Sequence, residues 1–426
     1  MKKTTLLLLS AILLFFCSCG NKAVKPDYTK WEIKDGKFYL DGKWKFLKIA
    51  KPLINFADSA AVDRYIQNLD LLKEKNFDAF ELNCYWHHFD KDGDGVPEMS
   101  LASLNRLIDA IYEKGMYPCL TVETYAVGGG QIPQGFWERY PDAEAIDNKG
   151  NKVSDTEYGF GGKVISIFHE GYRETVHNYI KNLAKGIDTK KILWFETTVE
   201  PQYMGTIPLC YSESARKEYN AWRAENGITD AESEMPTEFP IPDSFVQNET
   251  WNKFRAQFLA KWVNEDAAAY REVAGEDAYV AVDYLETSGH EMYLRNGNSD
   301  EFLRNLTGAN IIQVNWHWHL IEKAPHQKAY DRIHRIMKEE NRDWAISEHM
   351  TFNGSDFTPE EAPKVLENTL QNGTRLGWEF VTVTPSTKSS FSLYNDDFSP
   401  KDLMREVDDK WDYWMERVKE IEKSKK

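Results

Sequence analysis

Two glutamates stand where apolar runs of the sequence give way to loops. Glu200 ends the run at residues 191–200, and Glu348 ends the run at residues 344–348. Two carboxyl groups that meet across a cleft can cleave a glycosidic bond. One protonates the leaving oxygen, and the other attacks the anomeric carbon or activates a water. We therefore expect Glu200 and Glu348 to be the catalytic residues of a site that acts on carbohydrate.

The face on which Glu348 lies is expected from strand periodicity. Successive side chains of a strand alternate between two faces, so Trp344, Ile346 and Glu348 share one face. Two of the three are large and apolar, and we expect this row to face inward. A carboxylate at the top of such a row is not needed for packing, which favours a chemical role.

Two other glutamates compete for roles in the same site. Glu196 has the parity of Glu200, so we expect it to point inward and to lie deeper. It is the alternative acid; otherwise it is a buried structural carboxylate, paired with a neighbour such as Arg342 or a histidine. Glu123 ends a third apolar run and is expected to support catalysis or to bind a sugar hydroxyl.

Histidines and tryptophans gather near the same run ends, at residues 86–88 and 316–319. Four histidines are compatible with zinc, but the pattern supplies no third ligand beside His317 and His319, so we expect no metal and no cofactor. Neutral histidines can instead bind sugar hydroxyls, and His317 can contact the carboxylate of Glu348. We expect the tryptophans to form stacking walls, with core packing as the alternative for each. The expected substrate-binding residues are Trp86, His87, Glu123, Tyr125, Gln202, Trp316, His317 and Trp378.

An acidic segment at residues 90–95 has the form Asp-x-Asp-x-Asp-Gly, like the first half of an EF-hand loop. The twelfth position of that loop is Leu101 instead of a glutamate, and no EF-type helix precedes it. We expect a tight acidic turn, with calcium at Asp90, Asp92 and Asp94 as the alternative. Calcium there would rigidify the loop without entering the chemistry.

Eight short apolar runs alternate with amphipathic helical stretches. This alternation is typical of a parallel sheet covered by helices, and eight strands are the count of a (β/α)8 barrel. We expect an α/β fold, a single-domain (β/α)8 TIM barrel with its site at the carboxyl ends of the strands. A doubly wound sheet is the alternative, but the sequence contains no Gly-rich phosphate loop. The expected strands are residues 45–53, 77–85, 117–123, 191–200, 279–285, 310–316, 344–348 and 375–383.

Three further segments complete this expected barrel. Turn signals at residues 31–44 predict a hairpin that caps the bottom of the barrel. Residues 212–274 form a helical excursion after the fourth strand, and residues 400–423 form a last amphipathic helix.

Composition narrows the possible partners. The formal net charge is −16 and no basic patch is evident, which argues against nucleic acid and against anionic membrane surfaces. Aromatic residues make up 13% of the chain, an excess that suits sugar binding. The three cysteines beyond the first 20 residues, an odd number with no close spacing, demand no disulfide. Oligomeric state does not follow from the sequence.

The first residues read as a targeting segment. Residues 1–19 fit a lipoprotein signal peptide with a lipobox: two lysines, a short apolar run and a cysteine behind a small residue. We expect Cys19 to be lipidated, with Cys17 the poorer candidate and an ordinary secretory peptide the alternative. Residues 20–30 form a tether and residues 31–426 the barrel domain. The protein is then exported and held at the cell envelope by its lipid, its only contact with the membrane.

These motifs together resemble the retaining barrel glycosidases of clan A. Glu200 precedes a proline, as the acid/base at the end of strand four does there, and Glu348 matches the nucleophile at the end of strand seven. The excursion, from Cys210 through Tyr219 and Trp222, is similar in layout to family-42 β-galactosidases. The resemblance implies a retaining glycoside hydrolase for a β-linked neutral oligo- or polysaccharide, working through a glycosyl-enzyme intermediate. We also expect a raised pKa for Glu200, because Glu348 is a like charge nearby and the mouth is aromatic.

One position departs from the clan's pattern. The residue before the acid/base is normally an asparagine that binds the sugar 2-hydroxyl, and here it is Val199. Either another group holds the 2-position, or the substrate differs there, or catalysis is weaker. The alternatives are a non-catalytic glycan-binding lipoprotein and a metal-dependent hydrolase that uses His317 and His319.

Overall fold

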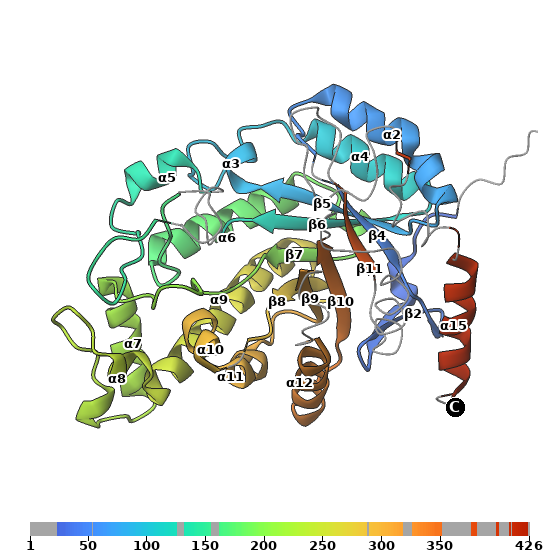
Figure 1. The fold of residues 1–426 in the computed structure, drawn as a ribbon. Coiled ribbons are helices and arrows are strands. Elements are labelled where there is room, and N and C mark those ends of the chain that lie inside the picture. The colour runs from blue at the N-terminus through green and yellow to red at the C-terminus, as the bar shows by residue number, and fades with distance from the viewer. Residues whose placement is uncertain are drawn as a thin grey trace, which may run out of the picture.

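The structure is a computed structural model. It describes residues 24–52, 54–125, 132–154, 162–287, 289–317, 326–351, 376–380, 398–399, 409 and 411–424. Strands occupy the centre of the molecule and helices surround them (Figure 1). Among the described residues, we find no helix with the length and apolar character needed to cross a membrane.

Eight parallel strands form the centre and pair in a closed order, in which the last strand returns to the first. Two of the registers have seven pairs each: Ala79–Tyr85 with Tyr117–Glu123, and Ile311–His317 with Ala345–Thr351. The predicted α/β class is therefore confirmed. In pairing order the strands are β10 (Ala345–Thr351), β11 (Leu376–Phe380), β4 (Lys48–Pro52), β5 (Ala79–Tyr85), β6 (Tyr117–Glu123), β7 (Phe195–Thr198), β8 (Val280–Tyr284) and β9 (Ile311–His317).

Helices follow most of these strands, and their ends have local causes. The side chains of Asp58, Ser212 and Asn248 accept hydrogen bonds from first-turn amides, which caps three helices. Gly115, at φ 72°, supplies the left-handed backbone after a fourth. The helices are α2 (Ser59–Glu74), α3 (Trp86–Phe89), α4 (Ala102–Glu113), α5 (Gln134–Arg139), α6 (Glu170–Lys185), α7 (Glu213–Glu225), α8 (Asp243–Val246), α9 (Glu249–Ala274), α10 (Gly289–Arg295), α11 (Ser299–Asn305), α12 (His326–Glu339) and α15 (Trp411–Ser424), with short 3-10 turns η1 (Tyr28–Lys30), η2 (Thr189–Lys191) and η3 (Ala231–Ser233).

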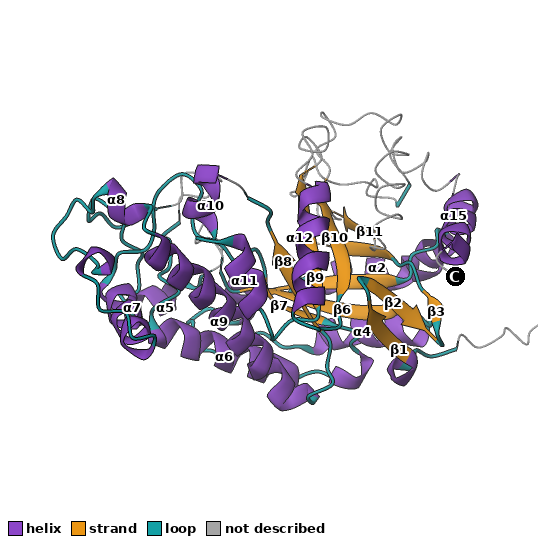
Figure 2. Ribbon diagram, turned by 90° about the horizontal axis from the view of Figure 1, so that it is seen from below, coloured by secondary structure: helices purple, strands orange, loops and turns teal. Residues whose placement is uncertain are grey.

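The predicted excursion is present between β7 and β8. Its helices α7 and α8 lie at the end of the molecule opposite α15 in both views (Figures 1 and 2). The long helix α9 runs back from the excursion and packs against α6 and β7. The excursion is thus joined to the strand that leads to Glu200.

Apolar side chains form two cores, which identify the two faces of each strand. An antiparallel sheet is formed by β1 (Trp31–Lys34), β2 (Lys37–Leu40) and β3 (Lys43–Trp44). In the inner core, apolar residues near the start of several barrel strands pack against this sheet. This sheet closes the bottom of the barrel, as predicted. The outer core lies between strands and helices and contains Phe80, Leu82, Val122, Val282 and Ile312.

The plug at the barrel bottom can be tested through Phe38. Its side chain is 2% exposed and stacks on Trp194, with ring centroids 5.8 Å apart. We expect Phe38→Ala to lower the free energy of unfolding by about 3–5 kcal/mol, because it leaves a cavity under the barrel. Urea denaturation measures this loss. Phe239, which is 42% exposed, is the matched control, and Phe239→Ala is expected to cost about 0.5 kcal/mol or less. Equal losses would show that the hairpin is not a plug.

Candidate active site

The predicted catalytic and binding residues lie in the strands of the barrel or in the segments that follow them. Glu348 lies in β10 with its Cα opposite Val314, and Trp316 lies opposite Met350. His317 is the last residue of β9, and Trp378 is the third of the five residues of β11; both strands pair with β10. The side chains of these four predicted site residues lie outside the described part, so their roles stay predictions. Cys19 lies outside the described residues altogether.

Trp344 and Ile346, which were predicted to face inward, face outward. Ile346 and Trp344 belong to the outer core, and the Trp344 ring lies 5.5 Å from His334 of α12. Ser347, in contrast, donates a hydrogen bond of 3.1 Å to Gln313 inside the barrel. The prediction for these two residues was wrong, because both faces of a buried parallel strand are apolar. Glu348 is the fourth of the seven residues of β10, and its catalytic role stays a prediction.

A register shift in β7 redirects the chain before Glu200. Glu196 pairs with Ala281, but Thr198 pairs with the very next residue, Val282. Thr198 consequently turns outward and donates a hydrogen bond of 2.9 Å to Asp266 of α9. The common parity predicted for Glu196 and Glu200 is therefore broken. Such bulges often re-aim a side chain beside an active site.

Glu200 itself lies two residues beyond β7 in an uncommon backbone conformation. Its φ is 44°, a left-handed value that costs free energy for a non-glycine residue. Its side chain is partly exposed. The direction of the carboxylate is therefore set by the bulge and by this φ. It does not follow from the alternation of side chains along the strand.

Two predicted substrate-binding residues support Glu200 from inside the protein. Gln202 is 2% exposed, and its Nε2 donates to Glu200 Oε2 at 3.3 Å. Tyr125 is 5% exposed, and its hydroxyl donates to the Gln202 carbonyl at 2.7 Å. Both residues thus hold the Glu200 loop in place. Direct contact of either with a sugar stays a prediction.

Trp86 does not form a stacking wall. It is fully buried, and its ring packs near Phe136, Tyr172 and Tyr179 at centroid distances of 5.6–6.3 Å. Its Nε1 donates to Asp90 Oδ2 at 2.8 Å. The prediction was wrong for this residue, because the chain turns into α3 directly after β5 and carries the indole into the core.

His87 and Glu123 remain at the mouth of the barrel. Both are partly exposed, and Glu123 ends β6 opposite Tyr85 at the end of β5. The His87 ring lies 5.7 Å from Tyr85 and 4.2 Å from His88. Burial, with a contribution from Lys91, lowers the pKa of His88, so this neighbour favours the neutral form. Both predicted ligands thus have exposed surface on the side where a substrate would enter.

Below the mouth, the barrel interior contains an ion cluster that the sequence reasoning missed. Lys51 of β4 lies 2.6 Å from Glu81 Oε1 of β5 and 3.9 Å from Glu196 Oε2 of β7. Thr121 donates to Glu196 at 2.6 Å, and Trp194 Nε1 donates to Glu81 at 3.2 Å. Both glutamates have 0% exposure. The sequence signal that could have revealed this cluster is that Lys51, Glu81 and Glu196 are charged residues within apolar strand runs.

This cluster decides the role of Glu196. Its partners are Lys51 and Thr121, whereas Arg342 donates to the carbonyls of Leu303 and Leu306. The predicted partner Arg342 was therefore wrong, and the structural reading of Glu196 was right. A fully buried, paired carboxylate is poorly placed to protonate a substrate.

A further carboxylate, Glu286, lies two residues beyond β8 and was also missed. It accepts hydrogen bonds of 3.0–3.2 Å from Arg332 of α12 and one of 2.5 Å from Tyr284. Tyr284 belongs to the outer core. Glu286 thus joins a strand end to the helix layer and lies outside the inner site.

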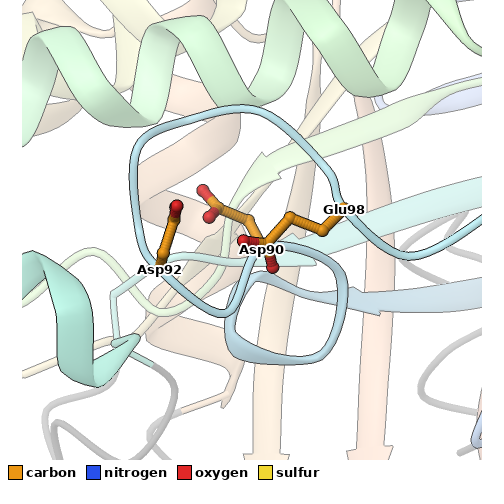
Figure 3. A group of neighbouring side chains, drawn as sticks. All are labelled: Asp90, Asp92 and Glu98. Atoms are coloured by element: carbon orange, nitrogen blue, oxygen red, sulfur yellow. The ribbon is translucent and has the colours of Figure 1, made fainter.

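The acidic segment after α3 is a turn held by Asp90 (Figure 3). Oδ1 of Asp90 accepts from the amides of Gly93 and Asp94, and Oδ2 accepts from the amide of Gly95 and from Trp86. Among the described residues, the group of carboxylates close enough for a cation is Asp90, Asp92 and Glu98, which differs from the predicted set. Glu98 also accepts from the Lys91 amide. The hydrogen bonds explain the turn without an ion.

Comparison with known proteins places the chain near β-galactosidases. The model of glycosyl hydrolase family 42, "Beta-galactosidase", matches residues 65–239, less than half of the chain. The match includes Glu200 and ends before Glu348. "Beta-glucosidase 44" of Arabidopsis thaliana is 34% identical over 101 residues, which are 21% of this chain and 20% of that protein. The resemblance to family 42 expected from the sequence is confirmed.

Solved structures agree on the fold. The β-galactosidase of Rahnella sp. R3 has a TM-score of 0.66 at 12% identity over 91% of this chain and 58% of its own. The β-galactosidase of Marinomonas ef1 has a TM-score of 0.63 at 12% identity over 88% and 61%. The chain thus spans about three fifths of each enzyme. Together with the family match, the TIM-barrel-like fold supports a glycoside hydrolase.

The ion cluster makes a prediction about stability. We expect Lys51→Met to lower the free energy of unfolding by about 3–5 kcal/mol, because it leaves Glu81 and Glu196 without their cation. Lys45→Met is the control, since the Lys45–Asp78 pair is partly exposed and should contribute about 1 kcal/mol or less. Urea denaturation compares the two. Equal effects would show that the interior pair is no more important than a surface pair.

Asp266, which anchors Thr198, makes a prediction about pH. Burial raises its pKa above 3.8, although His177, 3.3 Å away, and Thr198 oppose the rise. The folded state then holds the proton more strongly than the unfolded state. This contribution to stability is complete below 3.8 and is lost as pH rises through the folded-state pKa.

Asp266→Asn removes that ionisation and keeps groups that can bond to Thr198. The stability of the variant relative to wild type should therefore rise with pH across that interval, as urea denaturation at a series of pH values would show. A difference that does not change with pH would contradict the raised pKa.

Proposed function

We propose that the protein is a retaining glycoside hydrolase that cleaves a β-linked neutral oligo- or polysaccharide. The observation that carries this proposal is the placement of Glu200. A bulge in β7, a left-handed φ and the amide of Gln202 together hold its carboxylate at the carboxyl end of the barrel. This end of the fold is where barrel enzymes carry their active sites.

In the proposed reaction, Glu200 is the acid/base and Glu348 the nucleophile. Glu200 protonates the leaving oxygen while Glu348 attacks the anomeric carbon, which gives a glycosyl-enzyme intermediate. Glu200, now ionised, then takes a proton from a water that displaces Glu348. This mechanism requires carboxyl groups about 5–5.5 Å apart. The presence of Glu200 within the family-42 match supports its part of the assignment.

Val199 in place of an asparagine bears on how the sugar is held. Without that amide, we propose that the 2-hydroxyl is bound by groups from other strands, with His87 and Glu123 as the described candidates. Both are partly exposed beside the ends of β5 and β6. A neutral glycan suits a chain with a net charge of −16, because an acidic polymer would be repelled.

We also propose that the protein is exported and anchored at the cell envelope through a lipid on Cys19. The support is the signal-like pattern of residues 1–20, namely two lysines, an apolar run and a cysteine behind Ser18. In this location the barrel would meet external glycans.

The catalytic assignment is tested with residues 22–426 and their Glu200→Gln and Glu348→Gln variants. We expect hydrolysis of aryl β-glycosides or neutral β-linked oligosaccharides to fall at least about a thousandfold in both, because each removes a group that the transition state needs. Glu138→Gln, on the exposed side of α5, is the control and should keep full activity. Proton NMR of the first product should show the β anomer if the mechanism is retaining.

Each failure has its own meaning. Turnover that survives Glu348→Gln would remove Glu348 as the nucleophile. A wild-type protein that binds an oligosaccharide but hydrolyses nothing in the panel would replace the enzyme with a glycan-binding barrel.

A further inference from the structure

A chain of polar side chains leads from the surface of α10 to Glu200. Arg295 Nε donates a hydrogen bond of 2.8 Å to Glu291, and Arg295 Nη1 donates one of 2.9 Å to Gln202 Oε1. Gln202 Nε2 in turn donates to Glu200 Oε2. The side chain of Glu291 is 55% exposed, that of Arg295 is 13% exposed, and Gln202 is buried. The inner links thus lie away from water, where hydrogen bonds are stronger.

The end groups of this chain fix the orientation of the Gln202 amide. A guanidinium can only donate hydrogen bonds, and an ionised carboxylate can only accept them. The oxygen of Gln202 must therefore face Arg295, and its NH2 group must face Glu200. A flipped amide would set donor against donor and acceptor against acceptor. Arg295 thus selects the orientation in which Gln202 can donate to Glu200.

The backbone around the link is held on both sides. The amide of Tyr203 donates to the Arg295 carbonyl at 2.6 Å. Arg255 of α9, which is 2% exposed, donates to the carbonyls of Tyr293 and Leu294 just before Arg295. The end of α10 and the loop after Glu200 therefore form one anchored unit.

Gly205 makes room for the guanidinium. A Cβ atom at this position would lie 2.3 Å from Arg295 Cζ and also 2.3 Å from its Nη2. The φ of Gly205 is not in the left-handed region, so alanine would not strain the backbone there. Gly205→Ala would instead push the arginine head group away while leaving its charge in the chain.

We infer that Arg295 and Gln202 are positioning residues for Glu200. Arg295 orients the amide of Gln202, and that amide places a donor on Oε2 of the Glu200 carboxylate. This inference rests on the proposed function, in which Glu200 is the acid/base. A donor on Oε2 also stabilises the ionised carboxylate, the form that accepts a proton from water in the second half of the reaction.

The experiment compares Arg295→Met and Gly205→Ala with wild type, by steady-state kinetics across pH and by crystal structures. We expect kcat to fall about tenfold to a hundredfold while KM changes less than about twofold, because the substrate itself loses no contact. The alkaline limb of kcat/KM should move up by about one pH unit, because Glu200 then holds its proton more tightly. Arg295→Lys, which keeps a donor, should give an intermediate shift.

Arg304→Met is the matched control, since it removes a partly exposed arginine whose partners, Glu339 and Glu340, lie on and just beyond α12. It should leave both the rate and the pH profile unchanged. An unchanged profile in Arg295→Met and Gly205→Ala, with wild type active, would overturn the positioning role and leave the proposed function standing.

If wild type proves inactive, the proposed function fails and the crystal structures decide the inference separately. A Gln202 amide that turns away from Glu200 in Arg295→Met would support the selection of its orientation by Arg295. An amide that stays in place would overturn it.

Discussion

The ion pair between Lys51 and Glu81 is the interaction on which the barrel interior depends. Carboxylates that are removed from water must be paired or neutralised, and Lys51 lies within 4 Å of two of them. Because these groups come from β4, β5 and β7, the cluster also fixes those strands relative to one another. It forms a boundary: the interior beneath it is filled by apolar side chains, and the mouth above it is polar.

The site above this boundary is built from backbone irregularities as much as from side chains. A regular β7 would send Thr198 inward, where it would compete for space with Glu196. The bulge turns Thr198 outward to Asp266, and two residues later Glu200 adopts a left-handed φ. The free energy spent on this conformation is offset by the hydrogen bonds of Gln202 and Tyr125 around it.

The order of elements followed from the sequence because alternating apolar runs and amphipathic helices have few possible folds. The hairpin at residues 31–44, the excursion and the place of Glu200 after the fourth strand of the barrel were predicted on the same grounds. The face of Ile346 was not predictable, since a strand between an apolar interior and a helix layer is apolar on both sides. The bulge in β7 was equally hidden, because a one-residue register shift leaves no mark on composition. The prediction for Trp86 failed for a third reason, since an aromatic residue beside a strand end is as suitable for the core as for a sugar-binding site.

The long helix α9 connects the excursion to the strand that leads to Glu200. Its 26 residues make a rod about 39 Å long. Arg255, toward its start, donates to a carbonyl at the end of α10, and Asp266, further along, accepts from Thr198 on the outward side of β7. A change of length or sequence in α7 or α8 that moves α9 would therefore also move the loop of Glu200, because α9 contacts both α10 and β7. Variation in this outlying part of the chain can thus shift the loop of Glu200 while the residues of that loop stay the same.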